Sequence, residues 1–236
     1  ALSEAGMDVD IICLKSKGQP VKEVIGDIDV YRINLSHERR GHIRYLFEYA
    51  VFIAATAFIL TTRAINRHYD IIYIHNMPDI LIYTACINKL SGTKLILDLH
   101  DPMPELYQTI FEIPKTHLVI RFLAFLEKIS IGFADAAVTT NIAFRDLFIQ
   151  RSCRPEKMHI VMNTPMEDLF SNCTITNPVQ AYIPQKDTFN LMYHGTIVHR
   201  HGLDIAIRAA GLASENIPNL RFHIYGDGGY EEEAKR

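Results

Sequence analysis

The chain of 236 residues carries a net charge of −3, and 48% of its residues are hydrophobic while 22% are charged. This composition is typical of a globular protein with a sizeable core, and the net charge gives no reason to expect binding to nucleic acid. The four cysteines are widely spaced and form no Cys-x-x-Cys pair, which argues against a zinc ribbon or a disulfide framework and favours a reducing compartment.

Short apolar runs alternate along the chain with segments of helical periodicity. The predicted strands cover residues 9–14, 28–33, 70–75, 94–99, 136–139, 159–162, 189–194 and 220–225. The predicted helices cover residues 42–67, 80–90, 118–131, 143–151 and 203–214. This alternation indicates an α/β fold with doubly wound parallel sheets, in which ligands bind at the carboxyl ends of the strands.

The most apolar segment lies early in the chain. Residues 49–62 form a run of fourteen uncharged residues, which is shorter than the roughly 20 residues needed to span a bilayer. We therefore expect a buried helix there. A helix lying on a membrane surface is the alternative, and it is favoured by the basic side chains just upstream, namely Arg39, Arg40, His42 and Arg44.

A polar, proline-bearing stretch between residues 171 and 188 interrupts the alternation and predicts a domain boundary. We expect a first doubly wound domain over residues 1–175, a linker over 176–187 and the start of a second such domain over 188–236. The first six residues are typical of the last turn of a helix, and residues 230–236 are typical of the first turns of another. The sequence is therefore interpreted as an internal piece of a longer protein, truncated at both ends.

The stretch 190–209 has the features of an anion site at the start of a helix. An apolar strand leads into Gly195, a short loop carries Arg200 and His201, and Gly202 opens an amphipathic helix. Glycine lets a phosphate approach the backbone, the helix end offers free N–H groups, and the basic side chains add positive charge. The alternative is an ordinary strand-to-helix turn, which needs a glycine and a polar loop but binds no ligand.

Polar side chains also gather at the end of the predicted strand 94–99. His100 can donate, accept or carry a proton near neutral pH, while Asp101 and Glu105 can orient it or bind hydroxyl groups. We expect Pro102 and Pro104 to stiffen the loop that carries these groups. In the alternative interpretation, Asp98 and Asp101 only cap and turn the chain. The spacing of histidine and carboxylates matches no metal template, so no metal site is predicted.

A second polar segment follows the predicted strand 70–75. Asn76 and Asp79 are suited to capping a helix that begins near Pro78. His75 and Asn76 can also line the same crevice as His100, and the two interpretations are compatible.

Two further strand ends carry candidate binding residues. Asn163, at the tip of the strand predicted over 159–162, either faces the gap between the domains or forms an Asx turn. Gly226 and Gly228 predict a tight turn that brings the backbone close to a ligand. They do not complete a dinucleotide fingerprint, because Glu231 stands at the third glycine position.

Taken in order, these segments resemble the retaining, nucleotide-sugar-dependent glycosyltransferases of GT-B fold, the family 4-like group known as glycosyl transferase group 1. The resemblance covers essentially the whole chain. The matching strings are residues 1–14, with Met7 where histidine is common, and residues 69–75, 97–105, 134–140, 157–170, 193–209 and 222–232. Each string is loose by itself, and their shared order makes the resemblance specific at the level of the family.

The resemblance implies two Rossmann-like domains that face each other across a cleft. The first domain mainly binds the acceptor and the second mainly binds a nucleotide-diphosphate-sugar donor. It further implies transfer with retention of anomeric configuration, generally without a bound metal and without a tightly bound cofactor.

The resemblance also assigns residues. His100 matches the cleft histidine that helps to hold the transferred sugar and the acceptor, and Gly195 and Thr196 match the positions whose backbone meets the diphosphate. The usual pair of cations is missing, because His201 stands at the lysine position and Thr196 at the arginine position, so we predict that Arg200 supplies the charge. The predicted catalytic residues are His100, Asp101 and Glu105, and the predicted donor-binding residues are Gly195, Thr196, Arg200, His201, Gly202, Gly226, Gly228 and Asn163.

The function implied is transfer of a sugar to a glycan, lipid or small-molecule acceptor. We expect the protein in the cytoplasm, with peripheral contact at the inner face of the membrane as an alternative. No nucleic acid partner is expected. A sugar-nucleotide epimerase of the same fold and a non-catalytic nucleotide-sugar-binding relative remain as alternatives. The family's glycine-rich loop and the acidic pair that holds the donor sugar lie outside the sequence, so we expect little turnover from this piece alone.

Overall fold

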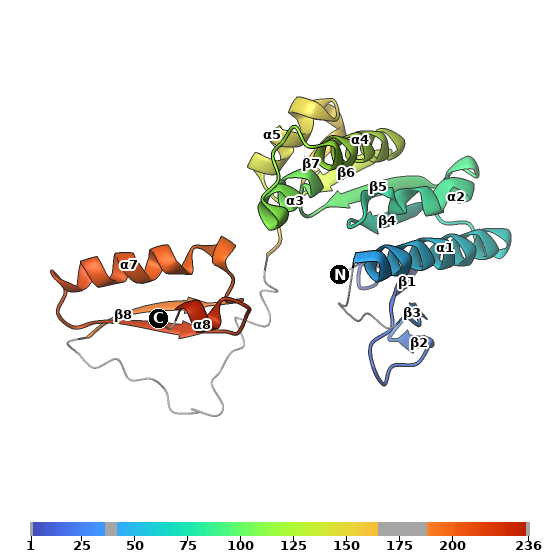
Figure 1. Cartoon of the computed structure of the whole chain (residues 1–236). Coiled ribbons are helices and arrows are strands. Elements are labelled where there is room, and N and C mark those ends of the chain that lie inside the picture. The colour runs from blue at the N-terminus through green and yellow to red at the C-terminus, as the bar shows by residue number, and fades with distance from the viewer. Residues whose placement is uncertain (1, 36–41, 165–187, 235–236) are drawn as a thin grey trace. The chain divides into compact units, whose positions relative to one another are not determined.

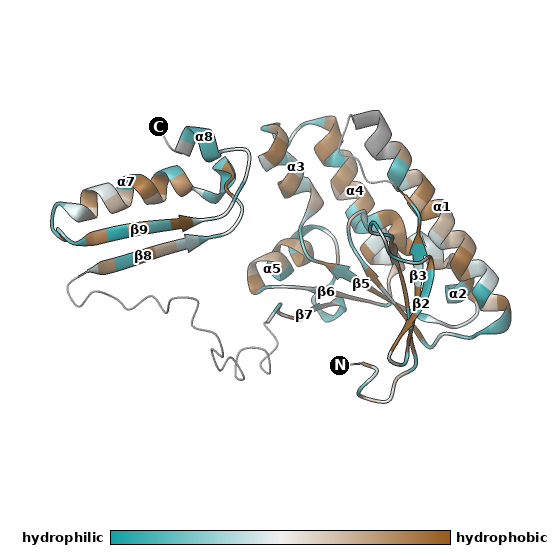
Figure 2. Cartoon of the chain, turned by 90° about the horizontal axis from the view of Figure 1, so that it is seen from below, coloured by the Kyte–Doolittle hydropathy of each residue, from teal (hydrophilic) through white to brown (hydrophobic). Residues whose placement is uncertain are grey.

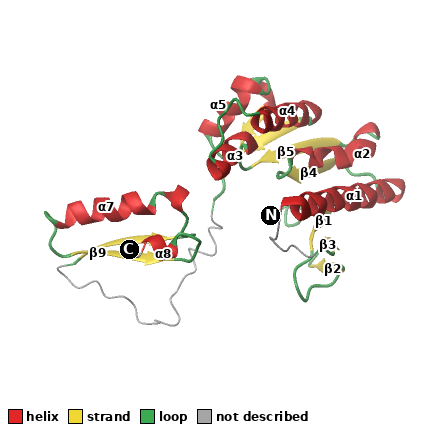
Figure 3. Cartoon of the chain, in the orientation of Figure 1, coloured by secondary structure: helices red, strands yellow, loops and turns green. Residues whose placement is uncertain are grey.

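The computed structural model describes residues 2–35, 42–164 and 188–234 (Figure 1). The chain divides into two compact units, Ala1–Thr164 and Pro165–Arg236. Strands and helices alternate in both units, which confirms the predicted α/β class (Figure 3). The predicted linker 176–187 lies outside the described residues, so the domain boundary placed there stays a prediction.

A four-stranded parallel sheet forms the centre of the first unit. Its strands are β4 Ile71–His75, β5 Lys94–Leu99, β6 Ala136–Thr139 and β7 Met158–Ile160, in the order β4-β5-β6-β7. Leu95, Leu97 and Leu99 alternate onto one face of β5 and are fully buried in the core. Because the strands are parallel, the polar segments that follow them meet at one edge of the sheet.

The helices of this unit largely follow the periodicity of the sequence. The structure confirms α4 Leu118–Phe133 and α5 Ile142–Arg151, and the Asn141 side chain caps α5 by accepting from the Phe144 N–H at 2.8 Å. The segment predicted as one helix over 80–90 is instead a 3₁₀ helix, η1 Asp79–Ala85, followed by the short helix α2 Cys86–Leu90.

A three-stranded sheet precedes the central one. Its strands are β1 Val9–Leu14, β2 Lys22–Ile25 and β3 Ile28–Ile33, in the order β1-β3-β2, with β1 parallel and β2 antiparallel to β3. Strand β2 was not predicted from the sequence, because it is short and mostly exposed. Gly26 and Asp27 form the two-residue connection of a hairpin, with φ of +58° at Gly26, and this glycine was the available signal.

One further prediction is wrong. The segment after Asp101 is not a proline-stiffened loop, because helix α3 Met103–Phe111 begins directly after Pro102. Proline is compatible with the first turn of a helix, where its missing N–H has no partner to lose.

Residues 2–6 form a turn that ends at Gly6, as predicted for a glycine stop. The Met7 N–H donates to the Leu2 carbonyl at 3.2 Å, the Gly6 N–H donates to the Ser3 carbonyl at 2.9 Å, and Gly6 has a φ of +80°.

Helix α1 His42–Asn66 is only partly buried, contrary to the prediction of a buried helix. Thr56 and Leu60 face the protein, whereas Phe47, Phe58 and Ile65 are 65%, 70% and 79% exposed on the opposite side. At 100° per residue these three exposed side chains share one face. Figure 2 shows apolar residues along the helix, and the part Phe47–Asn66 is long and apolar enough to cross a membrane, judged by length and composition alone.

The second unit contains a parallel pair of strands, β8 Phe189–His194 and β9 Leu220–Tyr225, connected through helix α7 Leu203–Ser214. These elements confirm the predicted strand-helix-strand order. The turn after β9 packs against the turn after β8, because the Ile197 N–H donates to the Asp227 carbonyl at 2.7 Å and the Tyr230 N–H donates to the Ile197 carbonyl at 3.1 Å.

The close approach of these two turns predicts the effect of adding one methyl group. A Cβ at Gly228 would lie 2.1 Å from the Ile197 carbonyl oxygen, whereas a Cβ at Gly229 would have no neighbour within 4 Å. We expect Gly228→Ala to destabilise the second unit by about 1–3 kcal/mol through overpacking. Hydrogen exchange of the β8 and β9 amides in the full chain measures this effect, with Gly229→Ala as the control. Equal protection in the two variants would contradict the prediction.

Candidate functional site

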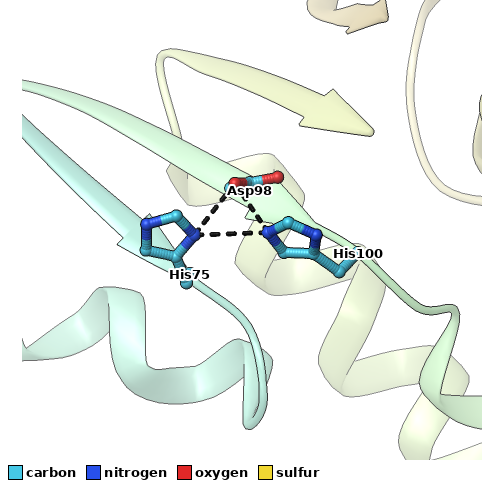
Figure 4. Close-up of side chains that lie close together, drawn as sticks. All are labelled: His75, Asp98 and His100. Atoms are coloured by element: carbon cyan, nitrogen blue, oxygen red, sulfur yellow. Dashed lines mark hydrogen bonds and ion pairs between the residues drawn. The ribbon is translucent and has the colours of Figure 1, made fainter. Parts of the chain in front are cut away.

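The candidate site is built around the carboxylate of Asp98 at the end of β5. Its side chain is 9% exposed, and its Oδ2 atom lies 2.9 Å from His75 Nδ1 and 3.0 Å from His100 Nε2 (Figure 4). The Tyr73 hydroxyl donates to the same oxygen at 3.0 Å. Three polar groups therefore converge on one buried anionic atom.

Strand geometry explains this convergence. His75 pairs with Asp98 in the β4–β5 register. Tyr73 lies two residues before His75, and His100 lies two residues after Asp98, so each points to the same face as its strand neighbour. The sequence analysis placed His100 and His75 at this edge but missed Tyr73 and the central place of Asp98. The alternation of side chains along the predicted strands indicated which residues share a face. It could not indicate which residues of the two strands pair with each other.

The environment keeps the Tyr73 hydroxyl protonated. Burial and the hydrogen bond to the Asp98 carboxylate raise the pKa of Tyr73 to about 12. At neutral pH, Tyr73 is therefore a donor that holds the carboxylate in place.

Asn76 holds the loop that follows β5. Its Oδ1 atom accepts from the His100 N–H at 3.0 Å, and its Nδ2 atom donates to the Asp101 carbonyl at 2.9 Å and to Asp79 Oδ1 at 3.2 Å. The helical cap predicted for Asn76 and Asp79 is wrong, because η1 begins at Asp79 with Pro78 before it and no side-chain cap bond. The prediction that this segment lies beside His100 is confirmed.

Asn163 also reaches this site. Its Nδ2 atom lies 3.5 Å from His100 Nδ1, so the amide contacts the ring on the side away from Asp98. The two predicted roles of Asn163, facing a gap between domains or forming an Asx turn, stay predictions. Asn163 thus joins His100 as part of one side-chain cluster.

Glu105 lies in the first turn of α3, where both of its carboxylate oxygens accept from Arg151. The Nη1–Oε1 and Nη2–Oε2 distances are 2.5 and 2.9 Å. Arg151 also binds Glu127, which is fully buried and accepts from the Ser152 hydroxyl. Glu105 is therefore held in a structural ion network, and its predicted catalytic role stays a prediction. Asp101 is exposed, and its carbonyl accepts the hydrogen bond from Asn76.

At the predicted anion turn of the second unit, the amides of Gly195 and Thr196 differ in their partners. The Gly195 N–H donates to the Tyr225 carbonyl at 3.0 Å, whereas within residues 188–234 the Thr196 N–H has no acceptor. The Thr196 carbonyl lies 3.0 Å from His201 Nδ1 and accepts from the Tyr193 hydroxyl at 2.9 Å. The turn thus leaves the amide of Thr196, rather than that of Gly195, available to a ligand.

Arg200 is the available cation of this turn. It is exposed and forms no ion pair with any residue in the described ranges. Gly202 adopts a left-handed conformation with φ of +69°, and α7 begins directly after it. Arg200 therefore lies three residues before the start of a twelve-residue helix, a position that suits an anion site.

Gly226 and Gly228 lie where the two turns of the second unit approach each other closely. A Cβ at Gly226 would lie 1.9 Å from the Gly195 carbonyl oxygen, so these glycines permit contact between two turns of the protein itself. The atoms that lie close to these two glycines belong to the backbone of Gly195 and Ile197. A role of either glycine in donor binding stays a prediction.

Comparisons with known proteins bear on both units. Residues 1–164 match a family model described as a glycosyl transferase 4-like domain. The structure is similar to that of a sucrose-phosphate synthase from Thermosynechococcus elongatus, with a TM-score of 0.63 and 15% sequence identity. This match covers 100% of the chain and 57% of the synthase chain. No curated protein sequence matches the chain.

These comparisons define the class of protein. The mixed α/β architecture with parallel sheets is that of the GT-B glycosyltransferase fold. Because the family model matches well over half of the residues, the chain belongs to the glycosyl transferase 4-like domain family.

Burial of Asp79 next to this site predicts a pH dependence of stability. Burial raises the pKa of Asp79 from 3.8 to about 6, against the hydrogen bond from Asn76 that lowers it. The folded state therefore binds this proton more tightly than the unfolded state, and stability is lost as pH rises from about 4 to 6. Asp79→Asn removes this loss, so we expect its stability relative to the wild type to increase over that range by up to about 3 kcal/mol.

Urea denaturation of the full chain at a series of pH values measures this difference. Asp70→Asn, at an exposed carboxylate of the same unit, is the matched control. A difference between Asp79→Asn and wild type that stays constant from pH 4 to 7 would show that Asp79 does not titrate in this way.

Proposed function

We propose that the protein transfers a sugar from a nucleotide-diphosphate-sugar to a glycan, lipid or small-molecule acceptor, with retention of anomeric configuration. Membership of the glycosyl transferase 4-like family supports transfer in general. The observation that carries the proposal is the cluster of His100, Asp98, His75 and Asn163 at the carboxyl edge of a parallel sheet. Such an edge is where open α/β folds bind their ligands.

In this proposal the first unit binds the acceptor and the transferred sugar. His100 is 36% exposed, so its ring can contact sugar hydroxyl groups while Asp98 and Asn163 hold its orientation. The exposed Asp101 carboxylate accepts hydrogen bonds from hydroxyl groups. Glu105 acts through Arg151 as a positioning residue for the start of α3, rather than by contact with the substrate.

The second unit binds the diphosphate of the donor. The free amide of Thr196 and the start of α7 after Gly202 direct N–H groups toward an anion. Arg200 adds the positive charge that stabilises the leaving diphosphate, with His201 beside it. No tightly bound cofactor is required in this scheme.

The proposed reaction is tested by incubating the full-length protein with radiolabelled UDP-, GDP- and ADP-sugars and an extract of lipid and glycan acceptors. We expect label to appear in an acceptor with the anomeric configuration retained. His100→Ala should lower the rate by about 10²–10⁴-fold, the range typical of a lost acid–base or orienting group. Isomerised donor without transfer would indicate an epimerase instead, and the absence of any turnover would indicate a binding protein.

The role of Arg200 predicts a specific loss of donor binding. We expect Arg200→Ala to weaken binding of the nucleoside diphosphate by about 10–100-fold, because a charge-assisted hydrogen bond is lost. Titration calorimetry with UDP, GDP and ADP measures this loss. Arg208→Ala, at an exposed arginine further along α7, is the matched control. Equal affinity of the two variants would overturn the assignment of Arg200.

We also propose peripheral contact with the acidic inner face of a membrane. The exposed apolar face of α1, with Phe47, Phe58 and Ile65, supports this contact, as do the basic residues that precede the helix in the sequence. The double variant Phe58→Ser/Ile65→Ser should bind vesicles of phosphatidylcholine and phosphatidylserine at least about tenfold more weakly. Co-sedimentation measures this binding, with Leu212→Ser, 68% exposed in the second unit, as the control. Unchanged sedimentation of the double variant would rule out this face.

A further inference from the structure

We propose that His75 Nδ1, Asp98 Oδ2 and His100 Nε2 together bind one divalent transition-metal ion. The two histidine nitrogens lie 3.3 Å apart, and they lie 2.9 and 3.0 Å from the carboxylate oxygen (Figure 4). Within the described ranges this is the one group of three such side chains whose ligand atoms come this close. The inference goes beyond the proposed sugar transfer and does not depend on it.

The three distances are those of ligands around a single ion. Two atoms each about 2.1 Å from a metal lie about 3.0 Å apart at a right angle and about 3.4 Å apart at the tetrahedral angle. The observed separations of 2.9–3.3 Å fall close to this range. An ion at bonding distance from all three atoms lies roughly 1 Å outside their plane, so its remaining coordination positions stay open on one side.

The arrangement of donors and acceptors in the cluster points the same way. Asp98 Oδ2 accepts from the Tyr73 hydroxyl and lies within 3.0 Å of both imidazole nitrogens, which lie 3.3 Å from each other. One divalent cation contacts all three ligand atoms at once and leaves Tyr73 as the hydrogen-bond donor to the carboxylate.

Surrounding groups are suited to orient the ligands. Tyr73 fixes the carboxylate through its hydroxyl, and Asp98 is 9% exposed, so the anionic ligand is buried and held before any ion binds. The amide of Asn163 lies 3.5 Å from His100 Nδ1, so it contacts the ring on the side away from the ligand atom Nε2 and supports its orientation.

The chemistry of the ligands selects the class of ion. Two imidazoles and one carboxylate form the kind of site that binds zinc, cobalt or ferrous iron, whereas magnesium and calcium prefer oxygen ligands alone. His75 and His100 are 64% and 36% exposed, which leaves a path for the ion and room for further ligands. The sequence alone predicted no metal, because a site formed by two adjacent strands has no fixed spacing along the chain.

The test measures metal binding by the full chain in the absence of any sugar, so its failure is distinct from a failure of the proposed transfer. After treatment with a chelator, the protein is titrated with Zn²⁺ by calorimetry and with Co²⁺ by visible absorption. We expect one ion per chain. His75→Gln and His100→Gln should each weaken binding by at least about tenfold. His68→Gln, at an exposed histidine of the same unit, should leave it unchanged.

The rival site is the histidine pair beside Arg200, so His199→Gln is included and should also leave the affinity unchanged. Because a ligand variant can fail to fold, the unaltered chain gives a second measurement. Zn²⁺ should protect His75 and His100 from modification by diethyl pyrocarbonate, mapped by mass spectrometry. The proposal is overturned by the absence of stoichiometric binding, by binding that both ligand variants retain, by loss of binding in His199→Gln, or by the absence of protection.

Discussion

The arrangement of the first unit depends on the burial of one carboxylate. A charged group that loses its water is unfavourable unless polar partners replace that water. Asp98 obtains its partners from neighbouring strands, because the β4–β5 register and the alternation of side chains direct Tyr73, His75 and His100 to the same face. The strand pairing that gives the buried carboxylate its polar partners therefore also assembles the side-chain cluster of the candidate site.

The loop that carries His100 is held at both of its ends. At the first end, Asn76 binds the His100 amide and the Asp101 carbonyl. At the other end, Arg151 links Glu105 to the fully buried Glu127. A loop tied in this way keeps its side chains in one orientation, which a site requires if it is to act without large rearrangement.

The sequence predicted the elements whose pattern is local. Continuous apolar runs located β5, β8 and β9, and the periodicity of α7 located that helix within the observed bounds. It did not locate α3, because two prolines favour a loop until it is known that they stand at the start of a helix. It also missed Tyr73 and the central place of Asp98, since strand register and the Arg151 network join residues far apart in the sequence and arise only from packing.

Arg151 and Arg200 differ in whether carboxylates of the protein neutralise their charge. Arg151 is enclosed by Glu105 and Glu127, so its charge is neutralised within the protein. Arg200 is exposed and forms no ion pair within the described residues, at a turn where the Thr196 amide also lacks an acceptor. The sequence singled out Arg200 as the cation for the diphosphate, but it gave no indication that Arg151 is held by two carboxylates. Since an arginine retains its charge at every physiological pH, the one without an internal carboxylate is the one that remains free to bind an external anion.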